Sequence, residues 1–230
     1  VLGVDAIVIA ACDSRALVGP LQRAVDAGIP VVTIDSGIDS DLASSLVATD
    51  NVAGARLAGR TLAALIGQRG KVGCIPFVAG AATSNQREQE FLEAMKEFPN
   101  IEVAHVLYSQ SQTAQALAVT EDMLTATPDL RGIFAANEIG AIGAIAALEG
   151  RRAADRVTLV AFDASPTEID ALRDGTVKAL VAQNPYKMGY EGVKTAWRVL
   201  RGKQVPRRID TGVTVITREN IDTPEVQALL

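Results

Sequence analysis

Short strand-like apolar runs alternate along this chain with segments of helical periodicity. The strand-like runs lie at residues 5–10, 30–35, 71–78, 101–108, 131–136, 156–162 and 177–183, followed by a last extended run at 212–217. Residues with the spacing of amphipathic helices lie between them, at 51–67, 84–98, 113–125, 141–148 and 189–200. Because helices that follow strands imply right-handed βαβ crossovers, the alternation predicts an α/β fold with parallel sheets.

Two interruptions in this alternation predict two lobes instead of one sheet. The pattern restarts after LVATDN at 46–51 and changes again after LVAQNP at 180–185. The strands read as nearly continuous apolar runs, as expected when both faces of a parallel sheet are buried. Several short crossings between two lobes would form a hinge, and a hinge allows a cleft to close on a ligand.

Composition argues against several classes of function. The net charge is −5 and no run of Lys and Arg marks a basic patch, which disfavours nucleic acid as a partner. No apolar run approaches the roughly 18 residues of a membrane-spanning helix. The first residues, VLGVDAIVIA, show no signal peptide, although a mature exported protein would look the same.

The residues that commonly carry catalysis or bind metals are sparse. His105 is the single histidine and lies on an apolar run, so no metal site, no Ser–His pair and no Cys–His pair is predicted. No glycine-rich phosphate loop is present, which predicts no nucleotide cofactor. Cys12 and Cys74 lie in or beside strand-like runs, so two buried free thiols are favoured over a disulfide. We expect Trp197 in the core, and no enzymatic activity, with a glycosidase-like carboxylate pair as the open alternative.

Polar residues stand where the apolar strands end. Asp35 follows PVVTI, Asn137 and Glu138 follow GIFAA, Asp163 follows TLVAF, and Gln183 follows ALVA. Ligands of open α/β folds bind beyond the carboxyl ends of parallel strands, and these side chains complement hydroxyl groups. The pattern therefore predicts a site for a neutral, polyhydroxylated small molecule. The alternative is local: the aspartates and Asn137 as helix caps or turn formers, and Glu138 as a solvated first-turn acid.

An ordered series of segments then makes the prediction specific. In order, the chain contains GVDAIVIA, DAGIPVVTIDS, VATDNVAGARLAGRTL, TATPDLRGIFAANEIGAIGAIAAL, VTLVAFDASPTEIDALRDGTVKALVAQNPYKMGYEGV and VITREN. This series resembles the ribose-binding branch of the type I periplasmic solute-binding proteins, over essentially the whole chain. The resemblance implies two Rossmann-like lobes joined by a three-segment hinge. Residues 1–49 and 184–211 would form the first lobe, and residues 50–183 and 212–230 the second.

The resemblance also implies that the first lobe is incomplete. Members of the family begin with two βα units before the strand that matches DAIVIA, whereas this chain starts almost at that strand. Without those units the strand at 5–10 would lie at an open edge of its sheet, which is an aggregation liability. We therefore expect either a fragment of a longer protein or a second chain that completes the sheet.

The family's sugar contacts map onto eight positions of this sequence. They are Asp35, Ser36, Arg87, Ser111, Asn137, Glu138, Asp163 and Gln183. Ser36 replaces the arginine and Ser111 the phenylalanine that are usual in ribose binders, which disfavours ribose. Arg87 has an alternative role as the partner of Glu90 on a helix face, and Gln183 an alternative role with hinge backbone groups.

The function implied by the resemblance is the solute-binding component of a sugar ABC importer. A monosaccharide or polyol would be bound in the cleft between the lobes, and the closed form would dock on the membrane permease. The protein would be periplasmic or otherwise extracytoplasmic, with a lipid anchor as an option. The alternative is the sugar-effector domain of a LacI-type transcription regulator, which the native upstream sequence would distinguish.

Overall fold

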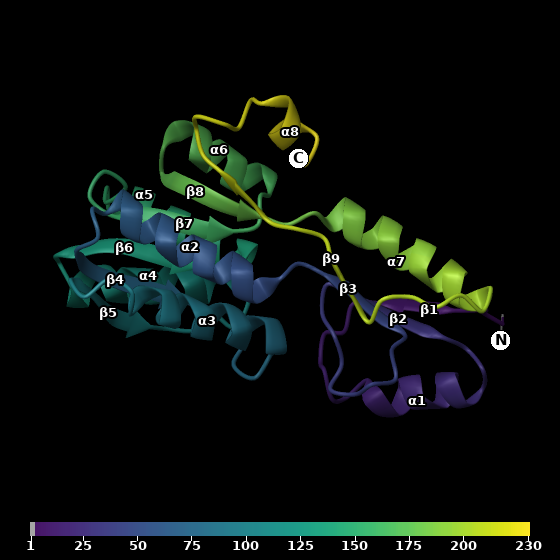
Figure 1. Ribbon diagram of the computed structural model, residues 1–230. Coiled ribbons are helices and arrows are strands. Elements are labelled where there is room, and N and C mark those ends of the chain that lie inside the picture. Colours follow the sequence, from purple (N-terminus) through teal and green to yellow (C-terminus); the bar gives the residue numbers. More distant parts are fainter. Residues whose placement is uncertain (1–2) are drawn as a thin grey trace. The chain divides into compact units, whose positions relative to one another are not determined.

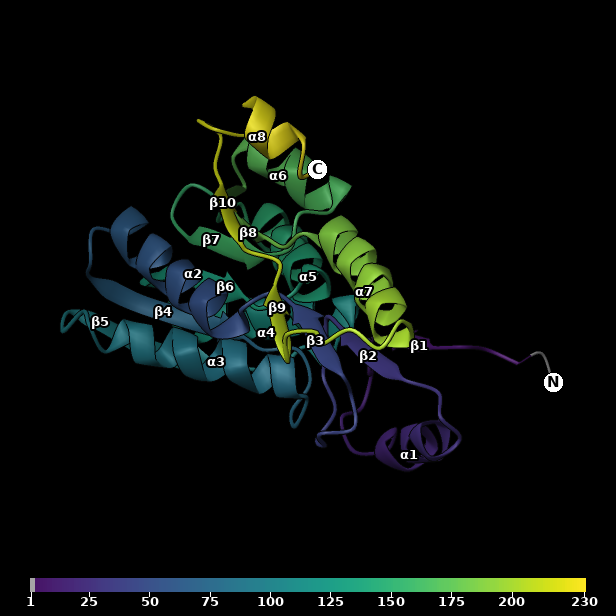
Figure 2. The same cartoon turned by 45° about the vertical axis from the view of Figure 1, so that its right-hand side comes forward.

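The computed structural model describes residues 3–230, which form two compact units (Figures 1 and 2). Unit 1 consists of the described residues up to Asp50 and of Asn184–Gly212, and unit 2 of Asn51–Gln183 and Val213–Leu230. The chain therefore passes from one unit to the other three times. Each unit is an α/β layer structure with its own sheet, as the alternation predicts.

Unit 1 has a four-stranded parallel sheet in the order β1-β2-β3-β9. Its elements are β1 (Ile7–Ile9), α1 (Val18–Asp26), β2 (Val31–Ile34), β3 (Ser45–Ala48), α7 (Pro185–Leu200) and β9 (Arg208–Asp210). Within residues 3–230, β1 pairs with β2 alone, in the register Ile7 to Val31. The expected edge position of this strand is therefore confirmed, and one row of its backbone groups is open to pairing.

The buried core of unit 1 is small. Val32 and Val47 from the sheet and Ala196 from α7 form its cluster of buried apolar side chains. Gly192 lets α7 approach the sheet closely, because a Cβ at this position would lie 2.5 Å from the Cγ2 of Ile34. The opposite face of α7 carries exposed aromatic side chains, and Trp197 is 50% exposed.

The expected core position of Trp197 is therefore wrong. Helix α7 turns Met188, Gly192, Thr195 and Ala196 inward, and the tryptophan lies outside that face. Its ring instead lies under the guanidinium of Arg201, 4.2 Å from the centroid. Apolar spacing predicts that a helix has an apolar stripe, but it does not tell which of two stripes the sheet covers.

Unit 2 has a six-stranded sheet in the order β10-β8-β7-β6-β4-β5, parallel except for β10. Its strands are β4 (Gly70–Ile75), β5 (Ile101–Val106), β6 (Leu130–Ala135), β7 (Thr158–Phe162), β8 (Val177–Ala182) and β10 (Thr214–Ile216). Its helices are α2 (Asn51–Leu65), α3 (Ala82–Met95), α4 (Thr113–Ala126), α5 (Glu138–Gly150), α6 (Pro166–Asp174) and α8 (Pro224–Gln227). The last extended run of the sequence is thus an antiparallel edge strand.

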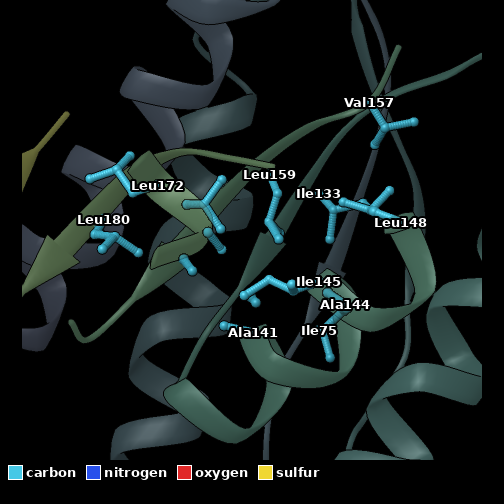
Figure 3. Packing of buried hydrophobic residues seen from close by; sticks show 14 of the residues in the cluster. Ile75, Ile133, Ala141, Ala144, Ile145, Leu148, Val157, Leu159, Leu172 and Leu180 are labelled. Atoms are coloured by element: carbon cyan, nitrogen blue, oxygen red, sulfur yellow. The ribbon is translucent and has the colours of Figure 1, made fainter. Parts of the chain in front are cut away.

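Both faces of the unit 2 sheet are buried. One cluster joins the sheet to α4, α5 and α6, and includes Ile75, Leu148, Leu159 and Leu180 (Figure 3). A second cluster joins the other face to α2 and α3, where the rings of Phe91 and Phe134 stack with centroids 4.8 Å apart. Two-face burial explains why these strands read as continuous apolar runs.

Both cysteines are free thiols, but they differ in exposure. Cys74 is buried within β4, and this burial raises its pKa well above the usual value. Cys12 is exposed, so its expected burial is wrong. The reason is that β1 ends at Ile9, which leaves Cys12 in the turns that follow the strand. Among residues 3–230, no helix combines the length and the hydropathy that a membrane crossing requires.

Candidate functional site

The carboxyl ends of β6, β7 and β8 in unit 2 bring four of the predicted site residues together. Gln183, directly after β8, donates from Nε2 to Oδ1 of Asp163 at 2.7 Å. The backbone N–H of Glu138, at the start of α5, donates to Oδ2 of the same carboxylate at 3.0 Å. Asp163 is therefore the centre of the cluster, with each oxygen held by a donor from a different element.

The backbone of Asp163 is itself unusual. Its φ is +87°, in the left-handed region that non-glycine residues seldom adopt. The N–H of Asp163 donates to the carbonyl of Val181 at 3.0 Å, which fixes the residue at the end of β7. A conformation of this kind costs about 1–3 kcal/mol and persists where surrounding contacts hold it, often at functional sites.

Asn137 is the N-cap of α5, which is the alternative role that the sequence predicts for it. Its Oδ1 accepts a hydrogen bond from the N–H of Gly140 at 3.0 Å and so caps α5. Gly140 has no Cβ, and one placed there would lie 3.0 Å from that oxygen. The side-chain NH2 of Asn137 is a separate pair of donors, so capping and ligand contact are compatible.

Arg87, on α3, is buried near the end of β6. Its Nε donates to Oδ1 of Asn51 at 2.8 Å, and its Nη1 donates to the carbonyl of Ala136 at 2.7 Å. The guanidinium lies 3.6 Å from the centroid of the Phe162 ring. Oxygens and an aromatic face thus compensate a buried cation, which would otherwise be costly. Glu90, the alternative partner from sequence, forms its ion pair with Arg56 at 2.6 Å.

Two buried acceptor oxygens near Asp163 have no hydrogen-bond partner within residues 3–230. They are Oε1 of Gln183 and Oε1 of Glu168. Buried polar atoms normally find a partner, so the Gln183 oxygen, directly after β8, suits a ligand or water that supplies a donor. Within the same described residues, no group of three or more His, Cys, Asp or Glu side chains is arranged to hold a metal ion.

The other predicted site residues follow other strands. Asp35 and Ser36 follow β2 in unit 1, where the hydroxyl of Ser36 donates to Oδ2 of Asp35 at 3.0 Å. Asp35 has a φ of +57°, so the strand-end aspartates of both units share the left-handed backbone. Ser111 lies in unit 2 between β5 and α4, exposed and with a φ of +51°.

Three residues that support the cluster were not assigned to the site from sequence: Asn51, Phe162 and Glu168. Asn51 and Phe162 hold Arg87, and Glu168 lies in the first turn of α6, the helix that follows Asp163. The sequence holds an indirect signal for Asn51 and Phe162. Arg87 stands four residues before Phe91 and so shares the buried face of α3, where a guanidinium needs buried partners. Glu168 has only a capping-box signal, which points to a helix start and not to a ligand.

Comparisons with known proteins agree with this architecture. Residues 2–204 match the model of the family described as periplasmic binding protein domain. The ribose import binding protein of Escherichia coli is 32% identical over 225 residues, covering 95% of this chain and 73% of that protein.

Two crystal structures from Agrobacterium vitis are similar to this chain, both of ABC transporter solute-binding proteins. One, bound with alpha-D-tagatopyranose, has a TM-score of 0.95 and 36% identity, covering 98% of this chain and 79% of that chain. The other, with bound D-fucose, has a TM-score of 0.94 and 39% identity, covering 99% of this chain and 79% of that chain.

Proposed function

Because the chain belongs to the periplasmic binding protein domain family, we propose that it is the solute-binding component of a sugar ABC importer. The observation that carries the proposal is the Asp163 cluster at the strand ends of unit 2. The similar proteins include a ribose import binding protein and structures with bound tagatose and fucose. We take the two units to be the two lobes of the family fold.

The ligand is an uncharged monosaccharide or polyol. Each sugar hydroxyl both donates and accepts, and the carboxylate, amide and guanidinium groups of the cluster provide both kinds of complement. A hydrogen bond to a charged partner contributes about 1.5–3 kcal/mol net. Five or six such contacts, reduced by ordering and desolvation, give micromolar affinity, about −8 kcal/mol.

Six of the eight predicted contacts come from unit 2 and two from unit 1. Asn137, Glu138, Asp163 and Gln183 act from the strand ends of unit 2 and Arg87 from α3, and Ser111 remains a weaker member because it is exposed. Asp35 and Ser36 are the contribution of unit 1. Binding through both units would favour the closed population of a hinged protein, and this closed form is the one that a membrane permease would receive.

The protein performs no chemical step in this proposal, and its place is the periplasm or another extracytoplasmic space. The amide of Gln183 and the backbone N–H of Glu138 hold the Asp163 carboxylate, and Oε1 of Gln183 is left as an acceptor for a hydroxyl donor, which is an arrangement for binding. The alternative of a LacI-type regulator finds no support, since the similar proteins given above are import or solute-binding components.

Titration calorimetry with D-fucose, D-tagatose and D-ribose tests the proposal. We expect micromolar binding of one of the first two, and weaker binding of D-ribose because Ser36 and Ser111 replace the residues of ribose binders. Asp163→Ala should weaken the affinity by at least about tenfold, because both neighbouring donors lose their acceptor. Asp170→Ala is the matched control, since Asp170 is exposed on α6.

Two outcomes count against the proposal. If none of these sugars binds at millimolar concentration, the chain is not a binding protein for this class of sugar. If a sugar binds and Asp163→Ala leaves its affinity unchanged while circular dichroism shows a folded protein, Asp163 is not part of the site.

A further inference from the structure

The carboxyl group of Glu168 is completely buried, five residues after Asp163 in the chain. Its Oε2 accepts hydrogen bonds from the N–H of Ser165 at 2.8 Å and from the hydroxyl of Ser165 at 2.9 Å. The hydroxyl of Ser165 in turn accepts from the N–H of Glu168, which closes a capping box at the start of α6. Oε1 has no partner within residues 3–230.

The charged groups that face this carboxyl are acids. Asp163, from the turn after β7, and Glu138, from the start of α5, both act electrostatically on Glu168. The bases of the elements packed around it lie toward the other end of α6. Arg173, in its last turn, pairs with Asp222 at 2.8 Å, and Lys178 of β8 donates to the carbonyl of Gly175.

From this geometry we propose that Glu168 is protonated in the binding-competent protein, and that the neutral carboxyl holds the turn that carries Asp163. Glu168 is a positioning residue that acts through Ser165, and it needs no contact with the sugar. The inference deepens the proposed function, on which its binding consequence rests.

Ionisation of Glu168 would place a third negative charge beside Asp163 and Glu138, in a buried position with one oxygen unpaired. Burial, followed by the charges of Asp163 and Glu138, raises the pKa of Glu168 to about 8, against the hydrogen bonds from Ser165 that act to lower it. The ionised carboxylate gains most by reaching water, and it can do so only if the capping box opens. In this proposal, opening of the capping box frees Ser165, two residues after Asp163, and so loosens the turn in which Asp163 has its positive φ.

A consequence is that sugar affinity depends on pH in a stated direction. Below about pH 8 the carboxyl is neutral and the turn is held. As the pH rises through this value, the carboxyl ionises and the affinity falls. A purely structural cap without a proton would give a flat profile over this range, because Asp and Glu ordinarily titrate near pH 4.

Calorimetry with D-fucose at pH 6.5 and pH 9 tests the binding consequence. The wild type should bind about threefold or more weakly at pH 9, a change that a single titration near pH 8 can produce. Glu168→Gln, which is permanently neutral, should keep the affinity of the wild type at pH 6.5 and show no loss at pH 9. Glu149→Gln is the control, since Glu149 is exposed at the far end of α5; it should follow the wild type.

Thermal unfolding between pH 5 and pH 9 tests the protonation of Glu168 without any sugar. In this window the folded protein binds more protons at Glu168 than the unfolded chain does, so the contribution of Glu168 to wild-type stability falls as the pH rises. The melting temperature of Glu168→Gln relative to the wild type should therefore increase from pH 5 to about pH 8 and then level off.

Each experiment has its own contrary outcome. If the melting temperatures of the wild type and Glu168→Gln change in parallel with pH, Glu168 is not protonated in the folded protein, even if D-fucose binds well. Equal loss of D-fucose affinity at pH 9 in both proteins would overturn the positioning role. Absence of binding by any sugar at either pH would instead overturn the proposed function, and the melting profiles would still decide the protonation.

Discussion

The two units use the same architecture with very different amounts of buried apolar surface. Unit 2 buries both faces of a six-stranded sheet beneath helices, whereas the buried cluster of unit 1 comprises Val32, Val47 and Ala196. Since stability follows buried apolar area, unit 2 has the means to fold on its own and unit 1 has far less. The comparison shows that a shared topology does not imply shared stability.

Hydrogen exchange should reveal the largest difference between the units. We expect the free energy of opening for amides of β2 and β3 to be lower, by about 2 kcal/mol or more, than that for amides of β6 and β7. The reason is the small core of unit 1, together with the open edge of β1. Mass spectrometry of exchanged peptides measures this, and equal protection of the two sheets would contradict the comparison.

A matched pair of core substitutions sharpens the comparison at single residues. Val32 in unit 1 and Val160 in unit 2 are both completely buried strand residues. Val160→Ala should lower the free energy of unfolding by about 2–3 kcal/mol, and Val32→Ala by about half as much, because a small core relaxes around the cavity more easily. Urea denaturation gives both values. A larger effect at Val32 would show that unit 1 is the more tightly packed.

The two strand-end aspartates allow the cost of backbone strain to be compared with the gain from side-chain hydrogen bonds. Asp35→Gly should stabilise unit 1 by about 0.5–1 kcal/mol, because glycine adopts a positive φ without strain. Asp163→Gly gains the same relief but loses the hydrogen bonds from Gln183 and Glu138, so we expect it to be destabilising. Thermal unfolding of the two variants tests this difference in sign. Stabilisation by both would show that the Asp163 contacts contribute little.

The smallest expected effect concerns the exposed face of α7. Trp197 is the only tryptophan, and it is half exposed. Trp197→Ser should change stability by less than about 0.5 kcal/mol, as surface substitutions usually do. Acrylamide should quench the fluorescence of the wild type readily. Resistance to quenching would mean that the indole is covered in solution.

The alternation of strands and helices was predictable from sequence because two-face burial leaves a strong apolar signal. Two strands were not expected. Most of β3 was assigned to the interruption at 46–51, and the three residues of β9 include Arg208 and Asp210. Exposure was less predictable still. Cys12 and Trp197 are exposed for reasons that depend on where β1 ends and which face of α7 meets the sheet.

For the candidate site, sequence indicated which strand ends carry polar groups but not how those groups pair. The bond from Gln183 to Asp163 depends on the register of β7 against β8, which shifts at an irregularity between Leu159 and Val160. The buried state of Glu168 depends on the packing of α6 against β8 and α5. Neither quantity leaves a pattern in a single sequence, because both arise from contacts between distant segments.

Because the chain passes three times between the units, the two sheets are completed at different stages of synthesis. A ribosome delivers β2 and β3 early, but α7 and β9, which complete their sheet and its cover, emerge only after β4 to β8. Domains generally fold as units during synthesis. Five of the six strands of the larger unit are therefore available before α7 and β9, and β2 and β3 wait for these two elements before their own sheet is complete.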